Sequence, residues 1–200
     1  QGHECQWNGP IWPLATSLVL GGLENLLNDY QDVPVTPRLY TDLMTVYAIS
    51  QRRITEDGRI FPWIDENLHP YTGDWISRTC LKTWEDNHWC SGKGGYERGK
   101  DYNHSSFCNH VISGLVGIRP RLDNRLVIHP LVNSQQWRWF CLDRVPYHGH
   151  FLTVVWDETG ERYSVGPGFT LLVDGIVRIR RSCLEPVEYI LEEKKEEVTL

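Results

Sequence analysis

The stretch that decides the fold of the C-terminal part is FTLLVDGIVRI, residues 169–179. Two runs rich in β-branched and aromatic residues lie on either side of Asp174-Gly175. An Asp-Gly pair between two such runs is a strong indication of a tight hairpin turn, because both turn positions need positive φ angles. The stretch therefore predicts a β-hairpin.

Similar short runs lie before this hairpin, at nearly even spacing. They are Leu126–His129, Trp139–Asp143, Phe151–Trp156 and Tyr163–Val165, separated by turn-forming residues such as Asn124, Gly149 and Gly160. Several short strands at regular spacing indicate an antiparallel β-sandwich. We expect this sandwich to cover residues 119–191, with a solvated charged tail at 192–200.

The first half of the chain has helical periodicity instead. Residues 11–30 predict a helix, with Pro13 near its start. Thr36-Pro37 is typical of a helix N-terminus and predicts a second helix to about Arg53. The expected apolar face of the first helix comprises Leu14, Leu18, Leu23, Leu26, Leu27 and Tyr30.

A long stretch rich in Gly, Asp, Asn and Trp follows, from Thr55 to Tyr102. It predicts an irregular segment of the kind that is usually functional. A third helix is expected from about Asn103 to Leu115, buried through Phe107, Val111, Ile112 and Leu115.

The pattern as a whole predicts an α+β chain. Helices and loops fill residues 1–118, and the sandwich follows after a boundary at Arg119–Arg121. Three helices with a long loop between them bury little apolar surface, so we expect residues 1–118 to be the end of a larger helical domain. The first residue is Gln1 and the chain contains one Met, Met44. We therefore expect this sequence to start inside a longer protein.

Composition narrows the classes of partner. The net charge is −6 and neither half of the chain is basic, so a nucleic-acid partner is not expected. No run approaches the length of a membrane helix, so no membrane partner is expected either. The chain has nine Trp, a surplus that suits stacking on sugars, a large interface or an ordinary aromatic core.

Cysteine and histidine spacing gives little support for a metal. The six Cys form no C-x-x-C pair, so a zinc ribbon is not expected. Cys80 and Cys90 are the best candidates for a disulfide, and free buried thiols are the alternative. His148-Gly149-His150 resembles a metal pair on a strand but lacks an acid close behind it. We therefore expect no metal and no cofactor, and we favour the cytoplasm over secretion.

One run carries a pattern suited to chemistry, Asp65–Gly73, with the sequence DENLHPYTG. A carboxylate pair lies in a turn-forming segment, and Trp63 and Trp75 lie on either side of it. Aromatic rings pack on sugar faces, and a partly desolvated carboxylate has its pKa raised towards the range of a general base. The alternative is a solvated acidic turn.

The order of several motifs resembles a known family. The motifs are WNGPIWP at residues 7–13, the run at 65–73, DYNHSSF at 101–107 and GLVGIRP at 114–120. Together they resemble the C-terminal part of an (α/α)6-barrel glycosidase of the mannosylglycerate hydrolase-like group. That group is related to glycoside hydrolase family 63 and, more distantly, to trehalases. The resemblance implies the last helices of an (α/α)6 toroid followed by a β-sandwich.

The resemblance also implies a mechanism. Glu66 occupies the position of the general base, which activates a water for attack on the anomeric carbon with inversion. Inverting enzymes hold their two carboxyl groups about 6.5–9.5 Å apart to leave room for that water. The partner acid in the family is an Asp that precedes the motif beginning at Trp7, so we expect the acid outside this sequence and Asp65 to point elsewhere.

Further residues match the family's sugar pocket. These are Trp7, Asn8, Gly9, Trp12, Asn67, Trp75, Asp101, Tyr102 and His104. Related enzymes carry Arg at the position of Asn8, and Asp101 matches a positioning residue. Two assignments stay open: Trp12 lines the pocket or packs in the core, and His104 closes the pocket or caps the third helix.

The sequence thus predicts the C-terminal portion of an inverting glycoside hydrolase. Its expected substrate is an α-linked glucoside, mannoside or similar small glycan, and we expect this chain alone to be inactive. The competing class is a non-catalytic carbohydrate-binding or interaction module.

Overall fold

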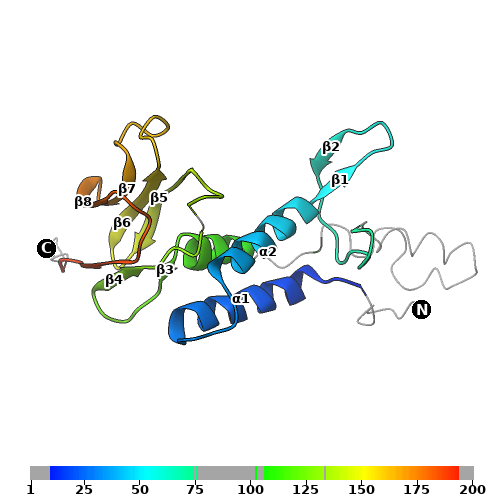
Figure 1. The fold of residues 1–200 in the computed structure, drawn as a ribbon, viewed down its shortest axis with the longest axis horizontal. Helices are drawn as coiled ribbons and strands as arrows, with labels where there is room; N and C mark the ends of the chain where they lie inside the picture. Colours follow the sequence, from blue (N-terminus) through cyan, green and yellow to red (C-terminus); the bar gives the residue numbers. More distant parts are fainter. Residues whose placement is uncertain (1–9, 74, 76–101, 103–105, 133, 194–200) are drawn as a thin grey trace, which may run out of the picture. The chain divides into compact units, whose positions relative to one another are not determined.

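The computed structural model describes residues 10–73, 75, 102, 106–132 and 134–193 of the 200-residue chain. The chain divides into two compact units. Figure 1 draws the chain as a ribbon, with the residues outside the description as a thin grey trace. The first comprises Gln1–Leu23 and Asp42–Phe107, and the second comprises Glu24–Thr41 and Cys108–Leu200. The Cys80–Cys90 pair lies outside the described residues. The boundary expected at residue 118 remains a prediction.

Two helices open the described chain, α1 at Pro13–Asp29 and α2 at Pro37–Ser50. Both were predicted. The Thr36 hydroxyl accepts a hydrogen bond from the Leu39 N–H at 3.4 Å, so the predicted N-terminus of α2 is confirmed. The helix ends at Ser50, a few residues before the predicted Arg53.

The predicted apolar face of α1 is partly wrong. Leu18 is 70% exposed and Tyr30 65% exposed, while Leu20 and Leu23 are buried together with Glu24. The helix is apolar over most of its circumference at residues 14–20, so periodicity alone does not single out one face.

The stretch expected to be irregular begins instead with a hairpin. Strands β1 (Arg52–Ile54) and β2 (Ile60–Pro62) pair antiparallel in the first unit. The turn between them is fixed by side chains: Thr55 and Arg59 both hydrogen-bond to Asp57. Both strands are short and largely exposed, including Ile54 of β1 and Ile60 of β2, so sequence periodicity could not find them.

The third helix is shorter and differently wound than predicted. It consists of α4 (Phe107–Asn109) and a π-helical turn, η2 (His110–Leu115). The Val116 N–H donates to the Val111 carbonyl at 2.9 Å, five residues back, as a π-helix requires. Leu115 is buried as expected, but Val111 and Ile112 are only half-buried, since the wider turn rotates His110 and Gly114 inward.

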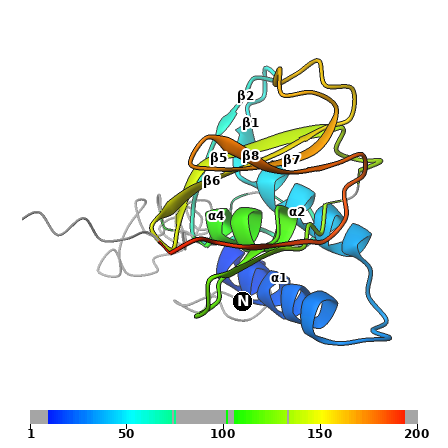
Figure 2. The ribbon, with the colours of Figure 1, turned by 90° about the vertical axis from the view of Figure 1, so that its left-hand side faces the viewer.

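The rest of the second unit is antiparallel sheet. One sheet has the order β3-β4-β9, with β3 at Ile118–Arg119, β4 at Arg125–Ile128 and β9 at Val187–Ile190. The other is a meander of β5 (Trp139–Tyr147), β6 (His150–Asp157), β7 (Gly168–Val173) and β8 (Ile176–Arg181), seen from a second side in Figure 2.

Both sheets contribute to the core. Leu126 and Ile128 of β4 are fully buried, as are Leu152, Val154 and Leu171 of the meander. Asp174 and Gly175 have φ angles of 51° and 79°, so the predicted β7–β8 hairpin turn is confirmed. Tyr163–Val165, predicted as a strand, is a bend instead. The α+β class with a C-terminal antiparallel sheet region is confirmed.

In the His148-Gly149-His150 triplet, His148 and Gly149 form the turn between β5 and β6, and His150 is the first residue of β6. His148 and Gly149 have φ angles of 48° and 77°. His150 Nδ1 lies 2.7 Å from Asp174 Oδ2, and its Nε2 lies 2.8 Å from the Glu192 carbonyl. His150 therefore links the β7–β8 turn to the backbone just after β9.

Among the described residues, no helix is both long enough and apolar enough to cross a bilayer.

Candidate functional site

The Glu66 segment, residues 65–73, is held between two other stretches of the first unit. Ile11 and Leu68 exchange both backbone hydrogen bonds at 2.9 Å, as an antiparallel pair does. Leu68 also bridges Trp75 in the antiparallel sense. The indole N–H of Trp75 donates to the Arg52 carbonyl at 2.9 Å, which ties this end to the β1–β2 hairpin. Backbone pairing therefore fixes the segment from both sides.

Burial differs sharply along this segment. Asp65 and Asn67 are completely buried, whereas Glu66 between them is only half-buried. The Asp65 carboxylate accepts a hydrogen bond from the Trp63 indole at 2.8 Å. Glu66 thus has solvent access that its two neighbours lack.

Trp63, just before the Glu66 segment, packs against side chains of the β1–β2 hairpin. The Arg53 guanidinium lies 4.9 Å from the centroid of the Trp63 ring, a cation–π arrangement. The ring of Phe61 packs against Trp63 with centroids 5.9 Å apart. The indole that holds Asp65 is itself held by the hairpin.

His69 and Gly73 form a turn at the end of the Glu66 segment. The backbone N–H groups of Tyr71 and Thr72 donate to His69 Nδ1 at 3.3 and 3.2 Å, so this nitrogen acts as an acceptor. Gly73 has a φ of 73° and donates to the His69 carbonyl at 2.9 Å. The His69 ring and its own carbonyl therefore hold the turn that closes the segment.

Some predicted pocket residues lie in this arrangement. Trp12 and Trp75 are buried and adjoin the two backbone pairs of Leu68, and Asn67 is buried beside Glu66. Tyr102 is about half exposed at 49%. The remaining predicted residues lie outside the described part of the chain: Trp7, Asn8, Gly9, Asp101 and His104.

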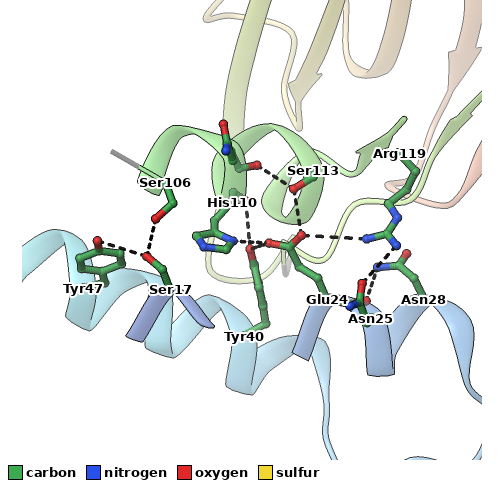
Figure 3. Close-up of polar contacts among 11 residues, drawn as sticks. Ser17, Glu24, Asn25, Asn28, Tyr40, Tyr47, Ser106, His110, Ser113 and Arg119 are labelled. Atoms are coloured by element: carbon green, nitrogen blue, oxygen red, sulfur yellow. Dashed lines mark hydrogen bonds and ion pairs between the residues drawn. The ribbon is translucent and has the colours of Figure 1, made fainter. Parts of the chain in front are cut away.

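A second carboxylate lies in the other unit, at the centre of the Glu24 network (Figure 3). The Tyr40 hydroxyl donates to Glu24 Oε1 at 2.6 Å, and His110 Nδ1 lies 2.6 Å from the same oxygen. The Ser113 hydroxyl lies 2.8 Å from Oε2, and Arg119 Nη1 lies 4.0 Å from it. Both oxygens of the buried carboxylate are therefore engaged.

Two opposing effects set the ionisation of Glu24. Burial alone would raise its pKa, but hydrogen bonds from His110, Tyr40 and Ser113 and the charge of His110 together hold the pKa below its ordinary value. Burial and the neighbouring carboxylate raise the pKa of Tyr40. An ionised Glu24 makes His110 Nδ1 the donor, and His110 Nε2 is buried with no hydrogen-bond partner among the described residues.

Comparison with known proteins assigns the chain. The family model described as the mannosylglycerate hydrolase MGH1-like glycoside hydrolase domain matches residues 2–105. The chain belongs to this MGH1-like glycoside hydrolase family. A second model, the C-terminal domain of glycosyl hydrolase family 65, matches residues 118–177 of the sheet region.

A solved structure supports this assignment. A protein named "Sialidase" is 36% identical to this MGH1-like chain, with a TM-score of 0.75. The match covers 98% of this chain and 16% of that one. The chain thus spans about one sixth of the solved relative, and it is a glycosidase-related piece of the α+β class.

The sequence of this MGH1-like chain did not predict that Glu24 is buried and hydrogen-bonded to Tyr40, His110 and Ser113. One feature could have revealed it: Glu24 follows Leu20 and Leu23 at helical spacing, which places an acid on an apolar face. Its partners come from residues far along the chain, such as His110, and no local pattern connects them.

Proposed function

We propose that this chain is the C-terminal portion of an inverting glycoside hydrolase, with Glu66 as the general base. One observation carries the proposal. Glu66 is a half-buried glutamate between two fully buried polar residues, on a segment paired on both sides, inside the stretch that matches the glycosidase family. A base needs a fixed position and access to water, and this arrangement offers both.

The partner acid is proposed to be an Asp in a part of the full-length protein that precedes Trp7. Asp65 suits the role poorly because it is fully buried and occupied by the Trp63 indole. The substrate class is proposed to be an α-linked glucoside, mannoside or similar small glycan. The six-hairpin helical barrel also remains a proposal, as do the assignments of residues 1–118 to its end and 119–191 to the sandwich.

The test is Glu66→Gln in the full-length protein, assayed on aryl α-glucosides and α-mannosides. Loss of the base is expected to lower kcat by about 10²–10⁴-fold while substrate binding persists. Glu56→Gln is the matched control, since Glu56 is an exposed glutamate of the same unit. Proton NMR of the first product formed by the wild type shows whether the anomeric configuration inverts. Wild-type turnover in Glu66→Gln refutes the assignment of the base.

A second experiment tests whether the general acid lies outside the 200 residues that contain Glu66. The 200-residue chain alone is expected to show no hydrolysis, because the general acid is proposed to lie outside it. Measurable turnover of the same aryl glycosides by the purified chain would show that both catalytic groups lie within these residues.

A further inference from the structure

A pocket of about 340 Å³ lies on the second unit, where β5 begins and β6 ends. It is lined by Arg138, Trp139, Glu158, Thr159, Glu161 and Arg162. This volume falls within the range typical of small-molecule sites, about 300–1,000 Å³. None of these residues belongs to the Glu66 segment or to the Glu24 network.

The wall formed by the loop after β6 is fixed by a buried acid. The Asp157 carboxylate accepts hydrogen bonds from the backbone N–H groups of Gly160 at 2.9 Å, Arg162 at 2.8 Å and Tyr163 at 3.0 Å. Burial opposes the ionisation of Asp157, but these bonds prevail and hold its pKa below the ordinary value. The Glu158 N–H also donates to the Arg138 carbonyl at 3.0 Å, so the loop is tied to the strand beside it. The pocket is therefore preformed.

The pocket presents an aromatic face. Trp139 is 49% exposed, although the Arg162 guanidinium lies 4.3 Å from its ring centroid and the Tyr163 ring meets it edge-on at 6.3 Å. These contacts hold the indole in one orientation and leave about half of it open. A fixed, partly exposed indole is the kind of surface on which an apolar ring face stacks.

The polar groups around Trp139 have balanced charge. The Arg138 Nε lies 2.6 Å from Glu158 Oε2, and Glu161 and Arg162 add one charge of each sign. A pocket without net charge does not select for an anion or a cation. Carboxylates only accept hydrogen bonds and guanidinium groups only donate them, so a ligand that serves both must carry groups able to do either. Hydroxyl groups meet that requirement.

We propose that this pocket is a second, non-catalytic binding site for a neutral saccharide. The C–H face of the sugar ring stacks on Trp139, and its hydroxyls donate to Glu158 or Glu161 and accept from Arg138 or Arg162. The proposal does not depend on Glu66 being a catalytic base. It gives the sheet region a role in holding a glycan.

The test follows the Trp indole N–H signals of the 200-residue chain by ¹H–¹⁵N NMR during titration. The probes are methyl α-glucoside, methyl α-mannoside and, as an acidic counterpart, the methyl glycoside of glucuronic acid. Trp139→Ala identifies the Trp139 signal by its loss. Phe151→Ala is the matched control, because Phe151 is an exposed aromatic of the same sheet with Arg144 4.8 Å from its ring centroid, outside the pocket.

We expect the neutral glycosides to shift the Trp139 signal saturably, in the wild type and in Phe151→Ala. Trp139→Ala is expected to weaken binding at this site by at least about tenfold, read from the backbone amide signals of residues 158–162 in the same spectra. The acidic glycoside is expected to bind no more tightly than the neutral ones. Unchanged affinity in Trp139→Ala, tighter binding of the acidic sugar, or a Trp139 signal that no neutral glycoside moves would each overturn the proposal. Shifts confined to the Trp63 or Trp75 signals would also overturn it while supporting sugar binding near Glu66.

Discussion

The Glu66 segment and the Glu24 network each hold a carboxylate, but they use it in opposite ways. Glu24 is buried, and both of its oxygens are engaged by side chains from two other parts of the sequence, α2 and η2. Glu66 is half-buried, and it is the neighbours Asp65 and Asn67 that are enclosed. A carboxylate fully occupied by internal donors stabilises a fold. A carboxylate that keeps solvent access on a fixed backbone can reach a substrate.

The sharpest way to break this comparison is to neutralise each acid in turn. Glu24→Gln is expected to lower the free energy of unfolding of the chain by about 3 kcal/mol, because His110, Tyr40 and Ser113 lose a charged acceptor. Glu66→Gln is the comparison, and it is expected to lower the free energy of unfolding by clearly less than Glu24→Gln does. Urea unfolding monitored by circular dichroism measures both. Equal losses in the two variants would show that Glu66 is as structural as Glu24.

A glycine pair tests how tightly the Glu24 network is packed. A methyl group on Gly114 would lie 1.9 Å from the Tyr40 hydroxyl oxygen and 2.8 Å from Glu24 Oε1. Gly114→Ala is therefore expected to destabilise the chain by about 2 kcal/mol. A methyl group on Gly22 of α1 meets nothing within 4 Å, so Gly22→Ala is expected to stabilise by about 0.5–1 kcal/mol. The same unfolding assay compares them, and destabilisation of equal size would contradict the described packing.

The smallest expected effect is a dependence on pH. The folded-state pKa of Glu24 is lowered, so its stabilisation is fully present above the ordinary value of 4.5 and is lost as the pH falls through the folded value. The stability gap between wild type and Glu24→Gln is therefore expected to be widest near neutral pH and to narrow below about pH 4.5. Other acids with lowered pKa values, such as Asp157, titrate in both proteins and cancel in the difference. A gap that stays constant from pH 7 to pH 3 would mean that Glu24 is not ionised in the fold.

Local chemistry made part of the fold predictable. The Thr36-Pro37 start of α2 and the Asp174-Gly175 turn each rest on residue types whose backbone preference is strong at that one position. Most strands of the meander are short runs of β-branched, aliphatic and aromatic residues bounded by turn-forming residues, and this composition predicted them. The strand predicted at Tyr163–Val165 is wrong. These residue types favour strands, but the Tyr163 N–H donates to the Asp157 carboxylate, which holds the segment in a bend.

The candidate site was predictable only in part. Family resemblance pointed to Glu66, yet the double pairing of Leu68 joins stretches whose contact no local pattern encodes. Two partners of Glu24, His110 and Ser113, lie in a π-helical turn. No residue preference predicts where a helix will hold the extra residue of a π-turn. Similarly, the Trp139 pocket forms because Trp139, at the start of β5, pairs with Asp157, at the end of β6, and the loop after Asp157 lies beside it. No local sequence pattern encodes that pairing.

The π-helical turn has an evolutionary consequence. It holds one residue more than an α-helical turn would, and that residue sets which side chains of His110–Leu115 reach Glu24. A homologue lacking the residue would carry its histidine about 100° away around the helix axis, leaving an acid at position 24 without its partner. Across the family, a single-residue gap in this helix and a non-acidic residue at position 24 should therefore be inherited together.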